Sequence, residues 1–292
     1  MAHDPLFDST WLKWAQAVHH TQTLEAEVKT RSENGNFEPL RAFRSEYHPK
    51  RHGFMVIAEK VDPVPVRWQL LLGDIANNYR SALDHLAWAL VTRGHKPPET
   101  GKLSPEQEQA VYFPIYEDRH MFNRAFPNKL PGVRRADIAE VRGPQPYYYS
   151  ARSRPGHVLV LLAGINPGDK HRTVQPVWAH PTHIDVEITY TQDCVLPSLS
   201  FRRYPDPLKV GAKLTFIRAR KVGPNPKIHV ELRVATKPSL GDLRPLEDWA
   251  LRCGHLIATL LARFSEPPDE VAEVADLAAL VASQEAIGLR LS

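Results

Sequence analysis

The longest amphipathic pattern in the chain runs from Trp68 to Arg93 and predicts a helix with one apolar stripe. Its apolar positions recur at steps of three and four residues: Leu72, Ile75, Ala76, Tyr79, Ala82, Leu83, Leu86 and Leu90. The opposite face holds Asp74, Asn77, Asn78, Ser81, Asp84, His85 and Trp88, with Arg80 on the flank. Asn, Ser, Asp and His are weaker helix formers than Lys, Glu or Gln, so solvation alone does not explain this face. We therefore expect the polar face to contact something.

The remaining periodic segments predict both helices and strands. Helices are expected at residues 8–32, 104–111, 134–141, 157–165, 244–264 and 269–289. Strands are expected at Leu40–Tyr47 and Phe54–Val61, which form a hairpin, and at 183–190, 212–220 and 228–235, which alternate with period two. The sequence thus predicts an α+β fold: a helical body with an antiparallel β hairpin near the N-terminus and a β-rich insertion before two C-terminal helices.

Along the chain we expect a mainly helical region over 1–182, an antiparallel β region over 183–240 and returning helices over 241–292, forming one integrated domain.

Composition adds little to this fold but limits the class of protein. The hydrophobic content of 42% and charged content of 24% are typical of soluble proteins. No apolar run is long enough to cross a bilayer, and the N-terminus lacks a secretory pattern, so we expect a cytoplasmic protein without membrane contact.

The charge balance permits an anionic partner. The formal net charge is +4, and the basic residues gather in two stretches. One surrounds the hairpin, with Arg41, Arg44, Lys50 and Arg51; the other comprises Arg202, Arg203, Lys209, Lys213, Arg218, Arg220 and Lys221, with Phe201, Tyr204 and Phe216 between them. Such strands either follow a nucleic-acid backbone or form the solvent face of a sheet. The run Tyr147-Tyr148-Tyr149 either stacks on bases or covers the core.

The segment Arg80-Ser-Ala-Leu-Asp-His85 resembles the R-x4–6-H signature of HEPN proteins, a family of helical domains that includes many metal-independent ribonucleases. The resemblance implies a homodimeric endoribonuclease that cleaves RNA by 2′-OH attack and needs no cofactor. It gives His85 the acid/base role and Arg80 the phosphate role, which suits imidazole and guanidinium chemistry. Five helical residues separate the two side chains by about 140°, so a second helix or subunit must complete the site.

A second candidate segment is Asp169-Lys170-His171-Arg172, which follows AsnProGly. Asp169 at this point is a good helix N-cap, and the basic residues after it predict an anion-attracting helix start. The chain over about 70–175 also resembles a widespread family of bacterial proteins with no assigned activity, which share NNYRSALDHLAWALV, PheProIle, GlnPro-Tyr and AspLysHisArg. The predicted shared site has catalytic candidates His85, Arg80, Asp84 and His171 and substrate-binding candidates Asn77, Ser81, Lys170 and Arg172.

Three other interpretations fit the same residues. In the structural one, Arg80 pairs with Asp84, and Ser81 with His85, at i,i+4 spacing. In the second, the face belongs to a non-catalytic module that binds a nucleotide, a phosphate group or a protein. In the third, the protein is a divalent-metal-dependent hydrolase whose ion is held by His85, Asp169 and His171, a mixed N/O ligand set.

Overall fold

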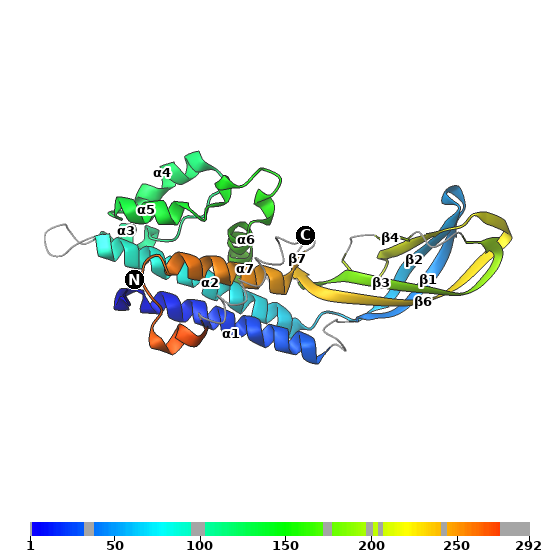
Figure 1. Ribbon diagram of the computed structural model, residues 1–292. Helices are drawn as coiled ribbons and strands as arrows, with labels where there is room; N and C mark the ends of the chain where they lie inside the picture. The colour runs from blue at the N-terminus through cyan, green and yellow to red at the C-terminus, as the bar shows by residue number, and fades with distance from the viewer. Residues whose placement is uncertain are drawn as a thin grey trace. The chain divides into compact units, whose positions relative to one another are not determined.

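The computed structural model describes residues 2–31, 38–94, 103–171, 177–196, 201–203, 207–240 and 244–274 (Figure 1). The protein is α+β, as predicted. Its chain forms two compact units that are each assembled from separate segments: Met1–Thr23, Leu70–Gln175 and Asp248–Ser292 in unit 1, and Leu24–Gln69 and Pro176–Glu247 in unit 2. The sequence-ordered sections that we expected differ from these units, because the hairpin groups with the later strands.

Unit 1 is helical. The labelled helices within the described residues are α1 (Asp8–Thr30), α2 (Val66–Gly94), α3 (Pro105–Ala110), α4 (Arg119–Lys129), α5 (Arg135–Arg142), α6 (Val158–His171) and α7 (Leu246–Leu261). Short 3-10 turns cover Pro5–Phe7, Pro49–Arg51, Pro146–Tyr148 and Arg154–Gly156. The predicted helix at 269–289 lies within the described residues only over 269–274, which are helical. Among the described residues, no helix combines the length and apolarity needed to cross a bilayer.

The core of unit 1 lies along the apolar stripe of α2. Every predicted stripe residue is buried, with no side chain more than 1% exposed. Helix α7 packs closely against Tyr79 because its facing residue is Gly254; a Cβ there would lie 2.4 Å from the Tyr79 hydroxyl oxygen. From α1, the Trp14 indole donates a hydrogen bond to the Gly254 carbonyl oxygen at 2.8 Å. The stripe therefore fixes α2 between neighbours and leaves its polar face to other contacts.

Unit 2 consists of two sheets. One has the order β1-β2-β5-β4, and the other has the order β3-β6-β7. The strands are β1 (Leu40–His48), β2 (Gly53–Val61), β3 (Val177–Val195), β4 (Phe201–Arg203), β5 (Lys213–Arg218), β6 (Lys221–Leu240) and β7 (Arg244–Pro245). The predicted hairpin is confirmed, and its second strand continues into antiparallel pairing with β5. Strands β3 and β6 are much longer than predicted and form a ribbon with three register shifts.

Two local predictions were wrong. No helix was predicted between 111 and 134, yet α4 forms there with Pro127 inside it. Its start is fixed by Asp118, whose carboxylate accepts a hydrogen bond from the Met121 amide at 2.8 Å. The long ribbon was underestimated because Pro181 and Pro238 discourage a strand assignment, although both occupy paired positions in it.

Candidate functional site

The polar face of α2 does not have uniform exposure. Trp88 is 44% exposed and Asp74 is also exposed, whereas Asn77, Ser81, Asp84 and His85 are half-buried. Asn78 is 9% exposed, and its side-chain amide donates to the Asp74 carbonyl oxygen at 2.9 Å. Asn78 therefore serves its own helix, and the face available to a ligand is formed by the other side chains.

Arg80 and Asp84 together hold the backbone of one distant residue, Phe113. Arg80 donates from Nε to Asp84 Oδ2 at 3.1 Å, and its Nη2 lies 2.9 Å from Oδ1. The same Nη2 donates to the Phe113 carbonyl oxygen at 2.9 Å, and the Phe113 amide donates to Asp84 Oδ1 at 2.9 Å. Both polar groups of the Phe113 backbone are thus satisfied. We name Arg80, Asp84 and Phe113 the Phe113 clamp.

Within the clamp, the Arg80 guanidinium is bound by groups of the protein itself. Its side chain is only 14% exposed, and its guanidinium also lies 5.7 Å from the centre of the Tyr112 ring. The predicted i,i+4 pair with Asp84 is confirmed. A guanidinium that is already bound to a carboxylate and a carbonyl has fewer N–H groups left for a phosphate.

Gln145 secures the next residues of the same connection. It is fully buried, and its amide nitrogen donates to the carbonyl oxygens of Pro114 at 2.8 Å and Val141 at 3.1 Å. Its side-chain oxygen accepts from the Tyr116 amide at 3.2 Å. The PheProIle and GlnPro segments, distant in sequence, therefore form one hydrogen-bonded structure with the Phe113 clamp. Both segments were predicted to matter only through a family resemblance, and their joint structural role was not predicted, because no local pattern relates Gln145 to Pro114 and Tyr116.

The surroundings of His85 shift the pKa of its imidazole. Burial lowers the pKa of its imidazole, the positive charge of Lys13 on α1 lowers it further, and Asp84 opposes these effects. A lowered pKa increases the neutral fraction at neutral pH, and a neutral imidazole has one donor and one acceptor nitrogen. No hydrogen bond joins His85 to Ser81, although both belong to the described residues. Lys13 was missed by the sequence analysis because nothing in the local pattern of α1 relates it to α2.

The second candidate segment does not begin a helix. Asp169, Lys170 and His171 are the last residues of α6, which starts at Val158, so the predicted N-cap at Asp169 is wrong. The actual start uses His157, whose Nδ1 accepts a hydrogen bond from the Leu159 amide at 3.3 Å. The carboxyl end of a helix carries partial negative charge, so the backbone here does not supply the attraction for a phosphate that a helix start would supply.

The predicted convergence of this segment with His85 falls largely outside the description. The side chains of Asp169, Lys170 and His171 are not among those described, and Arg172 lies outside the described residues. The structure therefore does not test the metal set of His85, Asp169 and His171. Elsewhere in the described parts of the chain, no group of three or more His, Cys, Asp or Glu side chains has the arrangement of a metal site.

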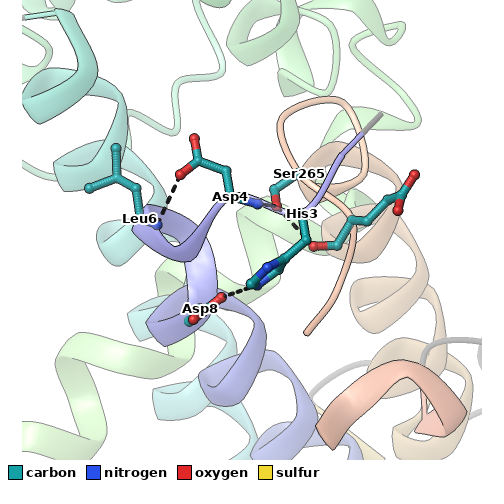
Figure 2. Close-up of polar contacts among 6 residues, drawn as sticks. His3, Asp4, Leu6, Asp8 and Ser265 are labelled. Atoms are coloured by element: carbon teal, nitrogen blue, oxygen red, sulfur yellow. Dashed lines mark hydrogen bonds and ion pairs between the residues drawn. The ribbon is translucent and has the colours of Figure 1, made fainter. Parts of the chain in front are cut away.

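A serine, a histidine and an aspartate also meet near the N-terminus (Figure 2). His3 Nε2 lies 2.7 Å from Asp8 Oδ1, and the buried Ser265 hydroxyl accepts from the Asp4 amide at 2.8 Å. The Ser265 hydroxyl donates in turn to the carbonyl oxygen of Glu266 at 2.9 Å. Because its proton is directed to a backbone carbonyl, Ser265 is not set up as a nucleophile. The cluster fastens the N-terminal segment to the chain after α7.

The aromatic residues noted in the sequence have mixed roles. Phe216 is 6% exposed and packs with Met55 and Ile57, so it is a core residue. Tyr147 packs against Phe122, and burial raises the pKa of its hydroxyl to about 12. The neighbouring Tyr148 and Tyr149 are exposed, while Tyr204 and the side chains of Phe201, Arg202 and Arg203 lie outside the description. The structure thus places part of the tyrosine run on the surface.

Comparison with known proteins does not extend the assignment. No protein-family model, no curated protein and no solved structure matches this chain. The candidate site is therefore defined by its geometry alone: a clamp made by Arg80 and Asp84, beside the half-buried Asn77, Ser81 and His85 and the exposed Trp88.

Proposed function

We propose that this protein is a non-catalytic binding protein whose α2 face takes a phosphate-bearing ligand such as a nucleotide. The observation that carries this proposal is the Phe113 clamp. A HEPN-type ribonuclease needs Arg80 to stabilise charge on the phosphate, but here Arg80 is bound to Asp84 and to the Phe113 carbonyl oxygen. Without the Arg80 charge to stabilise the transition state, the face is better suited to binding a phosphate than to cleaving its ester.

The residues beside the clamp have the chemistry for such a ligand. Trp88 is 44% exposed and lies three residues after His85, within one helical turn, so a base stacked on its indole places the phosphate near His85. Lys13 acts electrostatically on His85 and adds positive charge at the same place. Ser81 and Asn77 contribute polar groups one and two turns earlier. A phosphate bound here would raise the pKa of His85 and hold it as a cation.

Calorimetric titration with AMP tests this proposal. We expect saturable binding that is weakened about tenfold by His85→Ala and by Trp88→Ala, since each removes a direct contact. His255→Ala is the matched control because His255 is an exposed histidine on α7. If AMP does not bind, or if the control weakens binding as much as His85→Ala, the proposal is wrong.

The ribonuclease remains a second candidate because of one observation. The lowered pKa of His85 favours the neutral imidazole that a general base requires near neutral pH. EDTA-treated protein should be incubated with labelled mixed RNA, alongside His85→Ala. Cleavage that leaves 2′,3′-cyclic phosphate ends and is lost in the variant would replace the binding proposal. Cleavage only after addition of a divalent ion would favour the metal-dependent hydrolase with His85, Asp169 and His171.

The HEPN resemblance also implies a homodimer, because one α2 helix does not direct Arg80 and His85 to the same phosphate. Light scattering on the purified protein measures this directly. A dimer that persists in His85→Ala would allow the two candidate functions to be compared in the same assembly. A monomer that still binds AMP would support the binding protein alone.

A further inference from the structure

Strand pairing in unit 2 gathers basic residues from three separate segments. The turn between β1 and β2 contributes Lys50 and His52, and the end of β5 contributes Arg218, which pairs with Gly53. The Ala219 amide donates to the His52 carbonyl oxygen at 2.8 Å, and the Arg220 amide donates to the Val195 carbonyl oxygen at 2.7 Å. The first bond joins the residues after β5 to the β1–β2 turn, and the second joins them to the end of β3. We name Lys50, His52, Arg218, Arg220 and Lys221 the basic tip.

Glycine makes this gathering possible at one position. A Cβ at Gly53 would lie 2.4 Å from the carbonyl oxygen of Ile217 and 2.6 Å from the Phe216 ring. Any other residue would push β5 away from β2 and separate Arg218 from the β1–β2 turn. In Figure 1 the turn between β1 and β2 and the beginning of β6 lie at the same end of the unit.

The residues of the basic tip differ in their partners from Arg41 and Arg44 of β1. Arg41 is paired with Asp62 at 2.6 Å, and Arg44 is paired with Glu46 at 2.6 Å and with Glu59. All five residues of the basic tip are exposed. Within the described parts of the chain, no carboxylate forms an ion pair with them; the acidic residue that comes nearest along the strands is Asp193 of β3. The tip is therefore a concentration of positive charge that its own fold does not neutralise.

The distribution of charge along the chain also places the excess of positive charge in unit 2. The segments of unit 2 contain 19 Lys and Arg against 14 Asp and Glu, whereas those of unit 1 contain 18 against 19. Unit 2 thus carries the whole positive surplus of the protein. An anionic polymer would be attracted to this unit, and most strongly to its basic tip.

An exposed aromatic residue lies on the strand that leads to the tip. Tyr190 of β3 is 55% exposed and pairs with His229 of β6. Five residues separate it from Val195, which pairs with Lys221, and at about 3.3 Å per residue this is roughly 16 Å. A flat exposed ring at this distance from a cluster of cations suits a chain that has both phosphates and unpaired bases.

We propose that unit 2 binds single-stranded nucleic acid, with the backbone phosphates on the basic tip and a base stacked on Tyr190. The stacking position favours a single strand over a duplex, whose bases are already stacked on one another. It also favours nucleic acid over an anionic lipid surface, because lipid headgroups carry phosphates but no bases that could stack on the ring. The proposal does not rest on the α2 face, because the AMP titration can fail while unit 2 still binds a strand.

Fluorescence anisotropy with labelled oligouridylate and oligodeoxyuridylate of 20 nucleotides tests the proposal on the full chain. The variant Arg218→Gln/Arg220→Gln removes two charges from the basic tip. We expect it to weaken binding about tenfold and to reduce the slope of log affinity against log salt by about 1.4, which corresponds to two lost phosphate contacts. The matched control Arg41→Gln/Arg44→Gln removes the same net charge from arginines that are already paired, and should change affinity less than threefold.

Tyr190→Ala separates stacking from charge. We expect about tenfold weaker binding with an unchanged salt slope, because the ring contributes no counterion release, and Tyr190→Phe should restore binding. Three results would overturn the proposal: no binding by the wild-type protein, equal losses in the two arginine double variants, or binding to phosphatidylserine vesicles without binding to either oligonucleotide.

Discussion

The α2 face of unit 1 and the basic tip of unit 2 use arginine in opposite ways. Arg80 is 14% exposed and satisfies Asp84 and the Phe113 carbonyl oxygen, so its charge stabilises a connection within the protein. Arg218 and Arg220 are exposed, and among the described residues no carboxylate is paired with either. The comparison teaches that an arginine in a motif is informative about a ligand only when the fold does not already supply its acceptors.

The largest expected effect comes from breaking the clamp. Arg80→Ala leaves the half-buried Asp84 carboxylate without its cation and the Phe113 carbonyl without its donor. We expect a loss of about 2–3 kcal/mol, reduced from the value for a fully buried pair because the Asp84 side chain is 33% exposed. The melting temperature should fall by about 6 °C. The control variant Arg252→Ala, which changes an exposed residue, should have the melting temperature of the wild-type protein. A wild-type melting temperature in Arg80→Ala would contradict the structural role of the clamp.

Gln145→Ala extends this test to the next part of the connection. The change leaves the Pro114 carbonyl and the Tyr116 amide without a buried partner, and it opens a small cavity. We expect a loss of about 2 kcal/mol in the free energy of unfolding, measured in urea. Gln16→Ala on the exposed face of α1 is the control. A loss below about 0.5 kcal/mol would show that water replaces the glutamine without cost.

Acid pH should weaken the folded state through its buried histidines. Burial lowers the pKa of His157, so the folded protein resists protonation more than the unfolded chain. Its contribution is complete above the unfolded pKa of about 6.5 and is lost as pH falls through the lower folded value. His157→Asn keeps an acceptor for the Leu159 amide but does not titrate. We expect it to reduce the loss of stability between pH 7 and pH 5.

This pH dependence is measured as melting temperature against pH. It should flatten only in part in His157→Asn, because burial also lowers the pKa values of His85 and His180. The exposed His255→Asn should retain the full dependence. A variant profile identical to that of wild type would show that His157 is protonated without cost in the folded protein.

The smallest effect is expected from the paired arginines of the hairpin. Arg41→Ala removes an ion pair whose two side chains are 54% and 40% exposed, so solvent screens it strongly. We expect a change in the free energy of unfolding of about 0.5 kcal/mol or less, measured in urea. A loss as large as that of Arg80→Ala would remove the distinction between a clamp and a surface pair.

Much of the fold followed from periodicity. The α2 stripe and the β1–β2 hairpin were predicted because apolar spacing and turn residues are local properties. Helix α4 and the ends of β3 and β6 were not, because Pro127, Pro181 and Pro238 oppose those elements locally and only their surroundings stabilise them. The helix start predicted at Asp169 failed for the converse reason: AsnProGly is a strong local stop signal, and α6 continues through it.

The candidate site divides in the same way. The pairing of Arg80 with Asp84 could be read from i,i+4 spacing, because a helix fixes that distance by itself. The sequence alone also determined that cations surround the β1–β2 turn and the end of β5. Only the tertiary structure decided that Arg80 meets Phe113, 33 residues away, and that Arg218 pairs with Gly53 at the β1–β2 turn. Such contacts depend on chain packing and strand register, which arise from the sum of many distant interactions.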